Sequence, residues 1–285
     1  MTLDKELIQA ALAGEKSALE DLIKRHQDWV FNIALAFTGD RQDAADLSQE
    51  VLIKAITKLS NFKGNSEFRT WLYRIIKNHF LNLKRSEKTT LSFEAFAAGL
   101  DQTPDTALPQ DFHGVEQSLV VKEAKLSCMK GMLLCLTPEQ RMIYIIGELL
   151  ELPDTVGAEI MEISRANFRV KLHRVKKDLY SFMQEKCGLI NKNNPCRCAK
   201  KTAGFIKQGY VDPIHLHFQK DTIATINKVI GKKLEAYQED MMEQYRALYQ
   251  NHPFLKSPDL LDSIKDLLAS KSVKEIFDLD GASEN

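Results

Sequence analysis

Three thiols stand close together in the second half of the 285-residue chain, at Cys187, Cys196 and Cys198, with His215 and His217 further along. Thiolates and imidazoles bind soft divalent metals, but Cys-x8-Cys-x-Cys is not the paired Cys-x-x-Cys spacing typical of zinc sites. A metal ion, a redox-sensitive cluster and thiols that only pack are three open alternatives. If a metal ion binds, its predicted ligands are Cys187, Cys196 and Cys198.

The rest of the chain holds no grouping typical of catalysis. It has no glycine-rich phosphate loop, no Ser/His/Asp grouping and no His-Glu-x-x-His. Cys128 and Cys135 lie in an apolar helical segment and are expected in the core. Five cysteines are an odd number, which argues against a disulfide framework. We expect that the protein is not an enzyme and has no cofactor beyond a metal ion at the cysteines.

Charge is distributed in blocks, although 39 basic and 39 acidic residues balance over the whole chain. Residues 51–88 hold nine basic and two acidic residues, and residues 164–177 hold six basic residues and no acid. Residues 89–121 hold five acids and no base. Either basic block alone could be an ordinary solvated face. Two such blocks, each in a helical segment, predict two phosphate-facing surfaces.

Composition and hydropathy indicate the class of protein. A chain that is 44% hydrophobic is not wholly disordered, and its length predicts about two domains. No stretch is long and apolar enough to span a bilayer, and the first residues lack the layout of a signal peptide. We expect a cytoplasmic protein with no membrane partner.

Helical signals fill residues 1–88. Ser17 and Glu20 form a capping-box pattern ahead of an apolar stripe with helical period. Gly39 is expected to end that helix and Asp40 to cap the next one. The Gly-Asn-Ser content of residues 62–68 predicts a loop, and a long helix is expected from Ser66.

The remainder divides into three parts, and the whole chain predicts an all-α fold. Residues 89–118 show no period and predict an acidic linker. In residues 119–185, Thr137 begins a capping box, a short helix is expected over 154–161, and Ser164 caps a basic helix to about 183. This pair is typical of a helix-turn-helix. Residues 186–285 predict an extension, with a cysteine-bearing loop and then helices at about 219–250, 257–269 and 272–278.

Asp46, Gln49, Glu50 and Ile53 are spaced to share one face of a helix, away from the apolar stripe. Two carboxylates and an amide would suit docking of a basic partner. From the spacing alone, an ordinary solvated face is the favoured alternative.

Basic residues and amides line one side of the next helix. They are Arg74, Lys77, Asn78, Asn82 and Arg85, with aromatic residues between them. Bases stack on aromatic rings and asparagine reads base edges, so the pattern suits single-stranded or distorted nucleic acid. Core packing is the alternative role of the aromatic rings, and we favour it for Trp71.

These segments together resemble region 2 of the sigma-70 family, the promoter-recognition subunits of bacterial RNA polymerase. The resemblance rests on Asp46-x-x-Gln-Glu50, Phe62-Lys-Gly-Asn-Ser-Glu-Phe68 and Thr70-Trp-Leu-Tyr-Arg-Ile-x-x-Asn78, in that order. Segments 136–141, 159–164 and 172–179 resemble region 4 of the same family. The short linker between them resembles the extracytoplasmic-function (ECF) group. The likeness covers about residues 5–185.

The resemblance implies a sigma factor that binds core RNA polymerase and directs promoter-specific initiation of transcription. Its implied partners are core polymerase, promoter DNA and an anti-sigma factor. The implied domains are region 2 at 1–88, the linker at 89–118, region 4 at 119–185 and an added extension at 186–285. The implied polymerase contacts are Asp46, Gln49, Glu50 and Ile53. The implied DNA contacts are Phe62, Lys63, Asn65, Ser66, Arg74, Lys77, Asn78 and Arg85 in the first half, and Ser164, Arg165, Asn167, Arg169, Lys171, Arg174 and Lys176 in the second.

The second half departs from the family pattern. Gly157 stands where the family usually has a branched apolar residue, and Glu162 where it often has glycine. Asn167 and Phe168 replace the usual small residue and valine. These departures predict a bent helix-turn-helix or one that binds an unusual upstream element.

Two other functions are alternatives. A helix-turn-helix regulator that never enters polymerase would leave the docking face and loop of residues 1–88 unexplained. An enzyme with a Cys/His metal site would need a general base or nucleophile, and none stands out.

Overall fold

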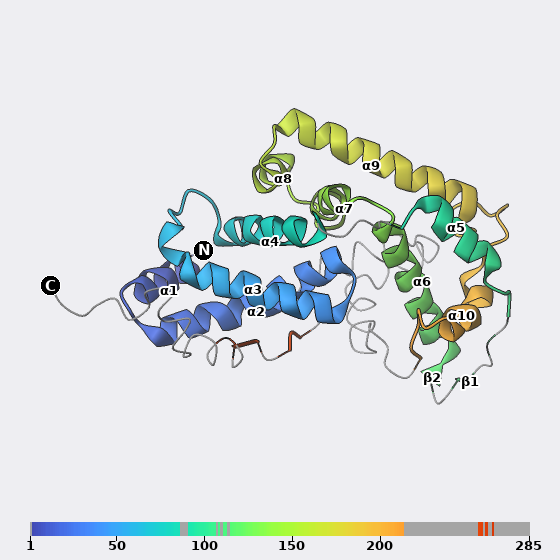
Figure 1. Cartoon of the computed structure of the whole chain (residues 1–285), viewed down its shortest axis with the longest axis horizontal. Coiled ribbons are helices and arrows are strands. Elements are labelled where there is room, and N and C mark those ends of the chain that lie inside the picture. The colour runs from blue at the N-terminus through green and yellow to red at the C-terminus, as the bar shows by residue number, and fades with distance from the viewer. Residues whose placement is uncertain are drawn as a thin grey trace. The chain divides into compact units, whose positions relative to one another are not determined.

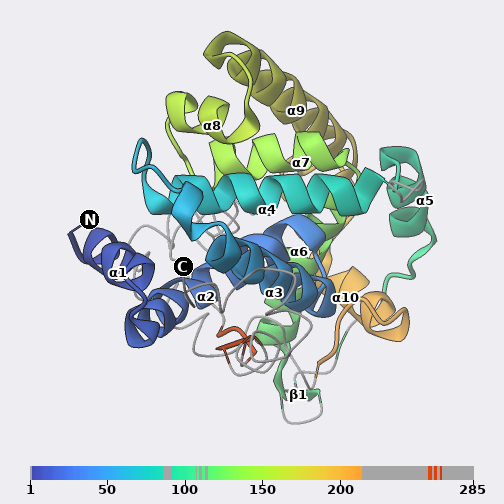
Figure 2. The same cartoon turned by 60° about the vertical axis from the view of Figure 1, so that its left-hand side comes forward.

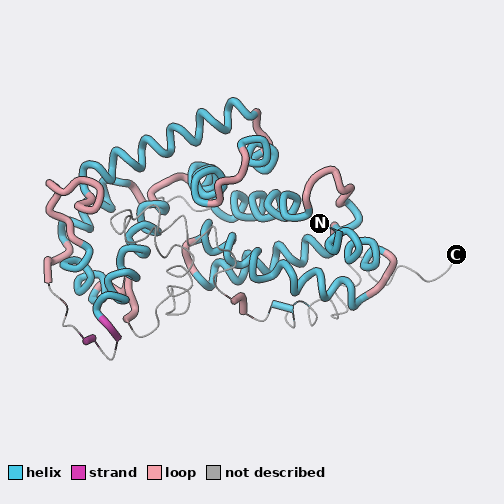
Figure 3. Tube along the Cα trace, turned by 180° about the vertical axis from the view of Figure 1, so that it is seen from behind, coloured by secondary structure: helices cyan, strands magenta, loops and turns pink. Residues whose placement is uncertain are grey.

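The structure, a computed structural model, describes residues 2–85, 91–106, 108, 111–112, 115–213, 256–258, 260–261 and 264. Nearly all of the secondary structure in this part of the chain is helical, as predicted (Figure 3). The chain forms two compact units, of which the first contains residues 1–86 and 255–285 and the second contains residues 87–254. None of the described helices is long and apolar enough to cross a membrane.

The first unit is built from α1 (Thr2–Leu12), α2 (Lys16–Thr38), α3 (Arg41–Thr57), the short 3-10 helix η1 (Leu59–Asn61) and α4 (Phe68–Arg85). Helix α2 packs against α1, α3 and α4 (Figures 1 and 2). Its core holds side chains with 0–1% exposure, among them Val30, Ile33, Phe37, Leu47, Val51, Leu72, Ile76 and Phe80. These residues recur at helical spacing, which explains why three amphipathic helices associate here.

Local signals explain where these helices begin and end. Gly39 has φ 74° and its N–H donates to the carbonyl of Leu35, so it ends α2 as predicted. The carboxylate of Asp40 accepts from the N–H groups of Gln42 and Asp43 and caps α3, also as predicted. The predicted Ser17 cap is wrong. Helix α2 begins at Lys16, and the Ser17 hydroxyl donates to the Glu15 carboxylate at 3.0 Å instead.

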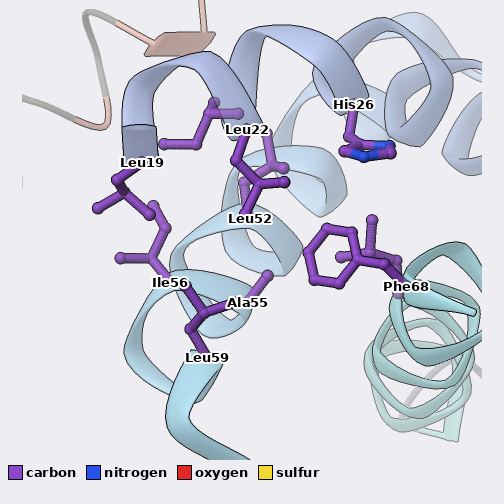
Figure 4. A pocket seen from close by; sticks show the side chains of 10 residues that line it. Leu19, Leu22, His26, Leu52, Ala55, Ile56, Leu59 and Phe68 are labelled. Atoms are coloured by element: carbon purple, nitrogen blue, oxygen red, sulfur yellow. The ribbon is translucent and has the colours of Figure 1, made fainter. Parts of the chain in front are cut away.

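A small cavity of about 20 Å³ lies inside this unit (Figure 4). Its lining is apolar apart from His26, which is 1% exposed and packs edge-on against Phe68. Burial lowers the pKa of His26, although the nearby Asp4 carboxylate acts in the opposite direction. A space this small holds about one water molecule, so the cavity is a packing defect and not a ligand site.

The second unit is also mainly helical. It contains α5 (Phe93–Gln102), the two-residue strands β1 (Asp111–Phe112) and β2 (Val115–Glu116), α6 (Gln117–Leu134), α7 (Pro138–Tyr144), the π-helix η2 (Ile145–Leu149), α8 (Asp154–Met161), α9 (Arg165–Lys186) and α10 (Cys198–Lys207). Helices α7 and α8 pack on α9, and α10 packs on α6. The predicted caps at Thr137 and Ser164 are confirmed.

The segment predicted as an acidic linker contains ordered structure. The Ser92 hydroxyl accepts from the Ala95 N–H and begins α5, and the antiparallel pair β1–β2 follows. Phe93 and Phe96 pack against Phe182 of α9, with ring centroids 5.0 Å and 5.9 Å apart. These two half-buried rings on one turn of α5 hold the segment against α9, a contact that the acidic composition obscured.

Several predictions for the C-terminal part lie outside the described residues. They are the helices at about 219–250 and 272–278 and the positions of His215 and His217. Of the helix predicted at about 257–269, Leu260, Leu261 and Ile264 are helical and buried, whereas Ser257 and Pro258 at its predicted start are described as non-helical.

Two of the departures from the family pattern in the second unit, Gly157 and Phe168, explain each other. A Cβ atom on Gly157 of α8 would lie 2.4 Å from Cζ of Phe168. The Phe168 residue is 1% exposed, so its ring has little room to move away. The large Phe168 therefore requires glycine at the facing position. Glu162 has φ 56°, a left-handed conformation that accounts for the preference for glycine at this turn.

We expect that Gly157→Ala lowers the free energy of unfolding by about 1–3 kcal/mol, because the added methyl group overpacks the contact with Phe168. Adding Phe168→Leu should recover part of this loss. Thermal or denaturant unfolding measures both effects. Gly99→Ala is the matched control in helix α5, because a Cβ atom added there would have no heavy atom of another element within 4 Å. Equal stability of the Gly157→Ala and Gly99→Ala proteins would contradict the explanation.

Candidate functional site

Helix α3 places the four predicted docking residues along one face. Asp46 and Glu50 are exposed, and Gln49 and Ile53 are half-buried. Asp46 accepts a hydrogen bond from Gln42 Nε2 at 3.1 Å, one turn earlier. The face therefore presents two carboxylates beside an apolar side chain, as the sequence pattern predicts.

Glu50 also contacts the neighbouring helix α4, where His79 Nδ1 lies 3.3 Å from its carboxylate. Burial and the charge of Lys54 lower the pKa of His79, while Glu50 acts to raise it. Near neutral pH the Glu50 charge is therefore not balanced by a fully protonated imidazole.

A cluster of aromatic rings anchors the loop between η1 and α4. The ring centroid of Phe62 lies 5.4 Å from that of Phe68 and 5.6 Å from that of Trp71, and Phe68 stacks on Trp71 at 5.5 Å. Between these anchors Lys63 and Asn65 are exposed and Ser66 is half-buried. Gly64, at φ 72°, makes the turn at the tip. The loop is thus fixed at both ends and open in the middle.

Two neighbouring residues of α4 that are predicted to contact nucleic acid, Lys77 and Asn78, differ in their exposure to solvent. Arg74 is half-buried and Asn78 and Asn82 are exposed, whereas Lys77 is 4% exposed. One residue turns an α-helix by about 100°, so Lys77 cannot share the solvent face of Asn78. Lys77 therefore does not lie on this surface. The backbone of Arg85 ends α4, and its side chain lies outside the described part of the structure.

The predicted DNA contacts of the basic helix α9 fall into an exposed group and a half-buried group. Ser164, Arg165, Asn167, Arg169 and Arg174 are exposed, and Lys171 and Lys176 are half-buried. Acids of α7, η2 and α8 pair with four of these bases. Asp154 pairs with Arg165 at 2.7 Å and with Arg169, Glu139 pairs with Lys171 at 2.9 Å, and Glu148 pairs with Lys176 at 2.6 Å.

Asp154 is the centre of this charge arrangement. The hydrogen bond from Arg165 lowers the pKa of its carboxyl group, and Arg169 adds to the effect. Asp154 and the two lysine-pairing acids lie outside the acid-free block and were missed from the sequence. Their place opposite α9 depends on helix packing, which the local pattern does not encode.

Cys187, Cys196 and Cys198 lie between the end of α9 and the start of α10. The backbones of Cys187 and Cys196 form a parallel bridge, and Cys198 begins α10. Cys128 of α6 joins them because α6 packs on α10. Burial raises the pKa of Cys128, and charge on Cys198, Cys196 and Cys187 would raise it further. Within the described residues, no three side chains of His, Cys, Asp or Glu have the geometry of a metal site.

The family model described as Sigma-70 region 2 matches residues 22–90, which contain most of α2, all of α3 and α4, and the aromatic-anchored loop. The ECF RNA polymerase sigma factor SigW of Bacillus subtilis is 25% identical over 182 residues, which are 61% of this chain and 94% of SigW. Residues 22–90 are thus a sigma-70 region 2, and over 61% of its length the chain is similar to RNA polymerase sigma factors of the ECF type.

Two further similar proteins align with different shares of this chain. The RNA polymerase sigma-H factor of Pseudomonas aeruginosa is 39% identical over 82 residues, which are 27% of this chain and 42% of that protein. The solved structure of CnrH in complex with the cytosolic domain of CnrY is 20% identical, with a TM-score of 0.46, and covers 64% of this chain and 98% of that chain.

We expect that Asp154→Asn strengthens binding of this protein to duplex DNA, because Arg165 and Arg169 lose their internal carboxylate partner. The slope of log affinity against log salt should steepen by up to ~0.9 for each additional phosphate that the released arginines neutralise. Fluorescence anisotropy over a salt series measures it. Asp178→Asn changes the net charge equally and is the control. An identical slope for both variants would contradict the competition between Asp154 and phosphate.

Proposed function

We propose that this protein is a sigma factor that binds core RNA polymerase through α3 and directs initiation at specific promoters through α4 and α9. The observation that carries the proposal is the match of sigma region 2 to residues 22–90. Those residues fold into the unit that has both an exposed carboxylate face and an aromatic-anchored loop. A plain helix-turn-helix regulator would need neither of them.

The polymerase contact is proposed for Asp46, Gln49, Glu50 and Ile53. The carboxylates would pair with basic residues of the largest subunit, and half-buried Ile53 would supply apolar contact at the centre of the interface. Charge pairs of this kind guide the encounter and fix its register. The exposure of both acids supports this role.

The minus-ten contact is proposed for the loop and the solvent face of α4. Phe62, Lys63, Asn65 and Ser66 would receive an unstacked base of the opened strand. Arg74 and Asn78, with Arg85, would hold the strand and its backbone. Rings suit this task because every base can stack on them. Lys77 is left out, because its burial assigns it a structural role in the unit.

The minus-thirty-five contact is proposed for α9. Ser164, Arg165, Asn167 and Arg169 lie at its N-terminal end, where a recognition helix reads base edges in the major groove. Lys171, Arg174 and Lys176 follow further along the helix and would contact phosphates. Sigma factors are not catalytic enzymes, and we infer that this chain does no covalent chemistry and acts in the cytoplasm, beside the polymerase. An anti-sigma factor is the further partner that we propose.

We also propose that the thiols of Cys187, Cys196 and Cys198, with Cys128 as a fourth ligand, rearrange from their positions in the structure, which lack metal-site geometry, to hold a soft divalent metal ion. The observation that favours it is the convergence of four thiols from α6, the end of α9 and the start of α10. A divalent cation would stabilise four neighbouring thiolates, which otherwise repel one another.

Replacing Asp46 and Glu50 together by Lys should weaken binding to core polymerase at least tenfold, because the reversed charges would face like charges. The fold should persist, because both side chains are exposed. Co-purification and run-off transcription with core polymerase measure the effect. The paired control is Glu6→Lys with Asp21→Lys, which makes the same change in net charge at exposed positions of α1 and α2. Run-off activity equal to wild type would refute the assignment of this face, and failure of the wild type to support initiation would refute the function.

Elemental analysis of the purified protein should find about one zinc ion per chain. Cys196→Ser with Cys198→Ser should abolish it, and Cys128→Ser should lower it. Cys135→Ser is the control, because the thiol of Cys135 donates to the carbonyl of Ser92 and is not one of the proposed ligands. Absence of zinc, together with unchanged stability of the serine variants, would mean that the thiols only pack.

A further inference from the structure

The described part of the C-terminal segment is fixed to the first unit by two hydrogen bonds on one oxygen. The backbone N–H of Ser257 donates to Oδ1 of Asp28 at 2.9 Å, and its hydroxyl donates to the same atom at 2.7 Å. Asp28 lies on α2, and the segment follows that helix in red in Figure 1. Hydrogen bonds to an ionised carboxylate are among the stronger ones in proteins.

Apolar burial holds the same segment. Leu260, Leu261 and Ile264 are 4%, 7% and 0% exposed, so one face of a helical turn is removed from water. Ser257 and Pro258 precede it, the residue types that begin a helix. The segment therefore has the features of the first turn of a packed helix, and not of irregular chain that rests on the surface.

This docked segment shares a surface with the polymerase contact. A hollow of about 420 Å³ is lined by residues of α2, of α3 and of the segment, among them Phe31, Ala45, Asp46, Gln49, Lys256 and Leu260. Asp46 and Gln49 are two of the four residues proposed to bind core polymerase. Lys256 brings a positive charge to the hollow that contains the Asp46 carboxylate.

We propose that residues 256–264 compete in cis with core polymerase for this surface of α2 and α3. The inference rests on the function proposed above, because it needs α3 to be the polymerase contact. The occupant matches the site chemically, because Lys256 shares the hollow with the Asp46 carboxylate, and Leu260 shares it with Phe31 and Ala45. Polymerase then binds only the fraction of molecules in which the segment has left, and its apparent Kd is the intrinsic Kd divided by that fraction.

The test uses full-length protein and titrates core polymerase against wild type, Asp28→Ala, Ser257→Ala and Leu260→Asp. Asp28→Ala removes the shared acceptor, while Ser257→Ala and Leu260→Asp change only the segment and leave α3 intact. Asp21→Ala, an exposed acid on the same helix, is the control. Amide hydrogen exchange over residues 256–264 reports on docking independently of polymerase.

The expected result is faster exchange of the segment in all three variants and affinity for polymerase raised about tenfold, a change of about 1.4 kcal/mol. The Asp21→Ala protein should match wild type in both measurements. Wild-type affinity in variants whose segment exchanges freely overturns this inference alone. A segment that already exchanges freely in wild type also overturns it. If neither wild type nor any folded variant binds polymerase, the proposed function fails, and this inference fails with it.

Discussion

The close association of α2 with α3 is the constraint on which the first unit depends. Gly39 and Asp40 join the two helices with almost no connecting chain, because one residue ends α2 in the left-handed conformation and the next caps α3. The turn fixes which faces meet, and Val30, Ile33, Leu47 and Val51 fill the contact without exposure. Asp46 and Glu50 are then obliged to point away from that contact, toward solvent.

The same helix pair also sets the position of the aromatic loop. Helix α4 packs on α2 and α3, and its first residue, Phe68, is buried against His26 of α2. Phe62 and Trp71 close around Phe68, so the exposed tip of the loop is mounted on the core through rings and not through backbone pairing. Rigid support of this kind would let the loop receive a base, in the role proposed for it, without ordering many residues at the moment of binding.

Much of this could be predicted from the sequence, because the signals are local. Helix periodicity, the caps at Asp40, Thr137 and Ser164, and the motifs around Asp46 and Asn78 depend on residues a few positions apart. The burial of Lys77, the order in residues 91–102 and the approach of Cys128 to the later cysteines were not predictable in this way. Each depends on a contact between distant parts of the chain, and the zero net charge gave no hint of which acids face which bases.

Those long-range contacts have a common effect on binding. Bases of α9 pair with Asp154, Glu139 and Glu148, and the α3 surface that contains Asp46 is shared with Lys256 and its neighbours. At the surfaces proposed to bind DNA and polymerase, binding would therefore replace an internal partner with an external one, and the net free energy of binding would be a difference between two similar interactions. Exposed ion pairs contribute only about 0–1 kcal/mol, so phosphates can displace the acids readily. The segment at 256–264 is held by buried leucines as well, which makes the polymerase surface the more strongly occluded of the two.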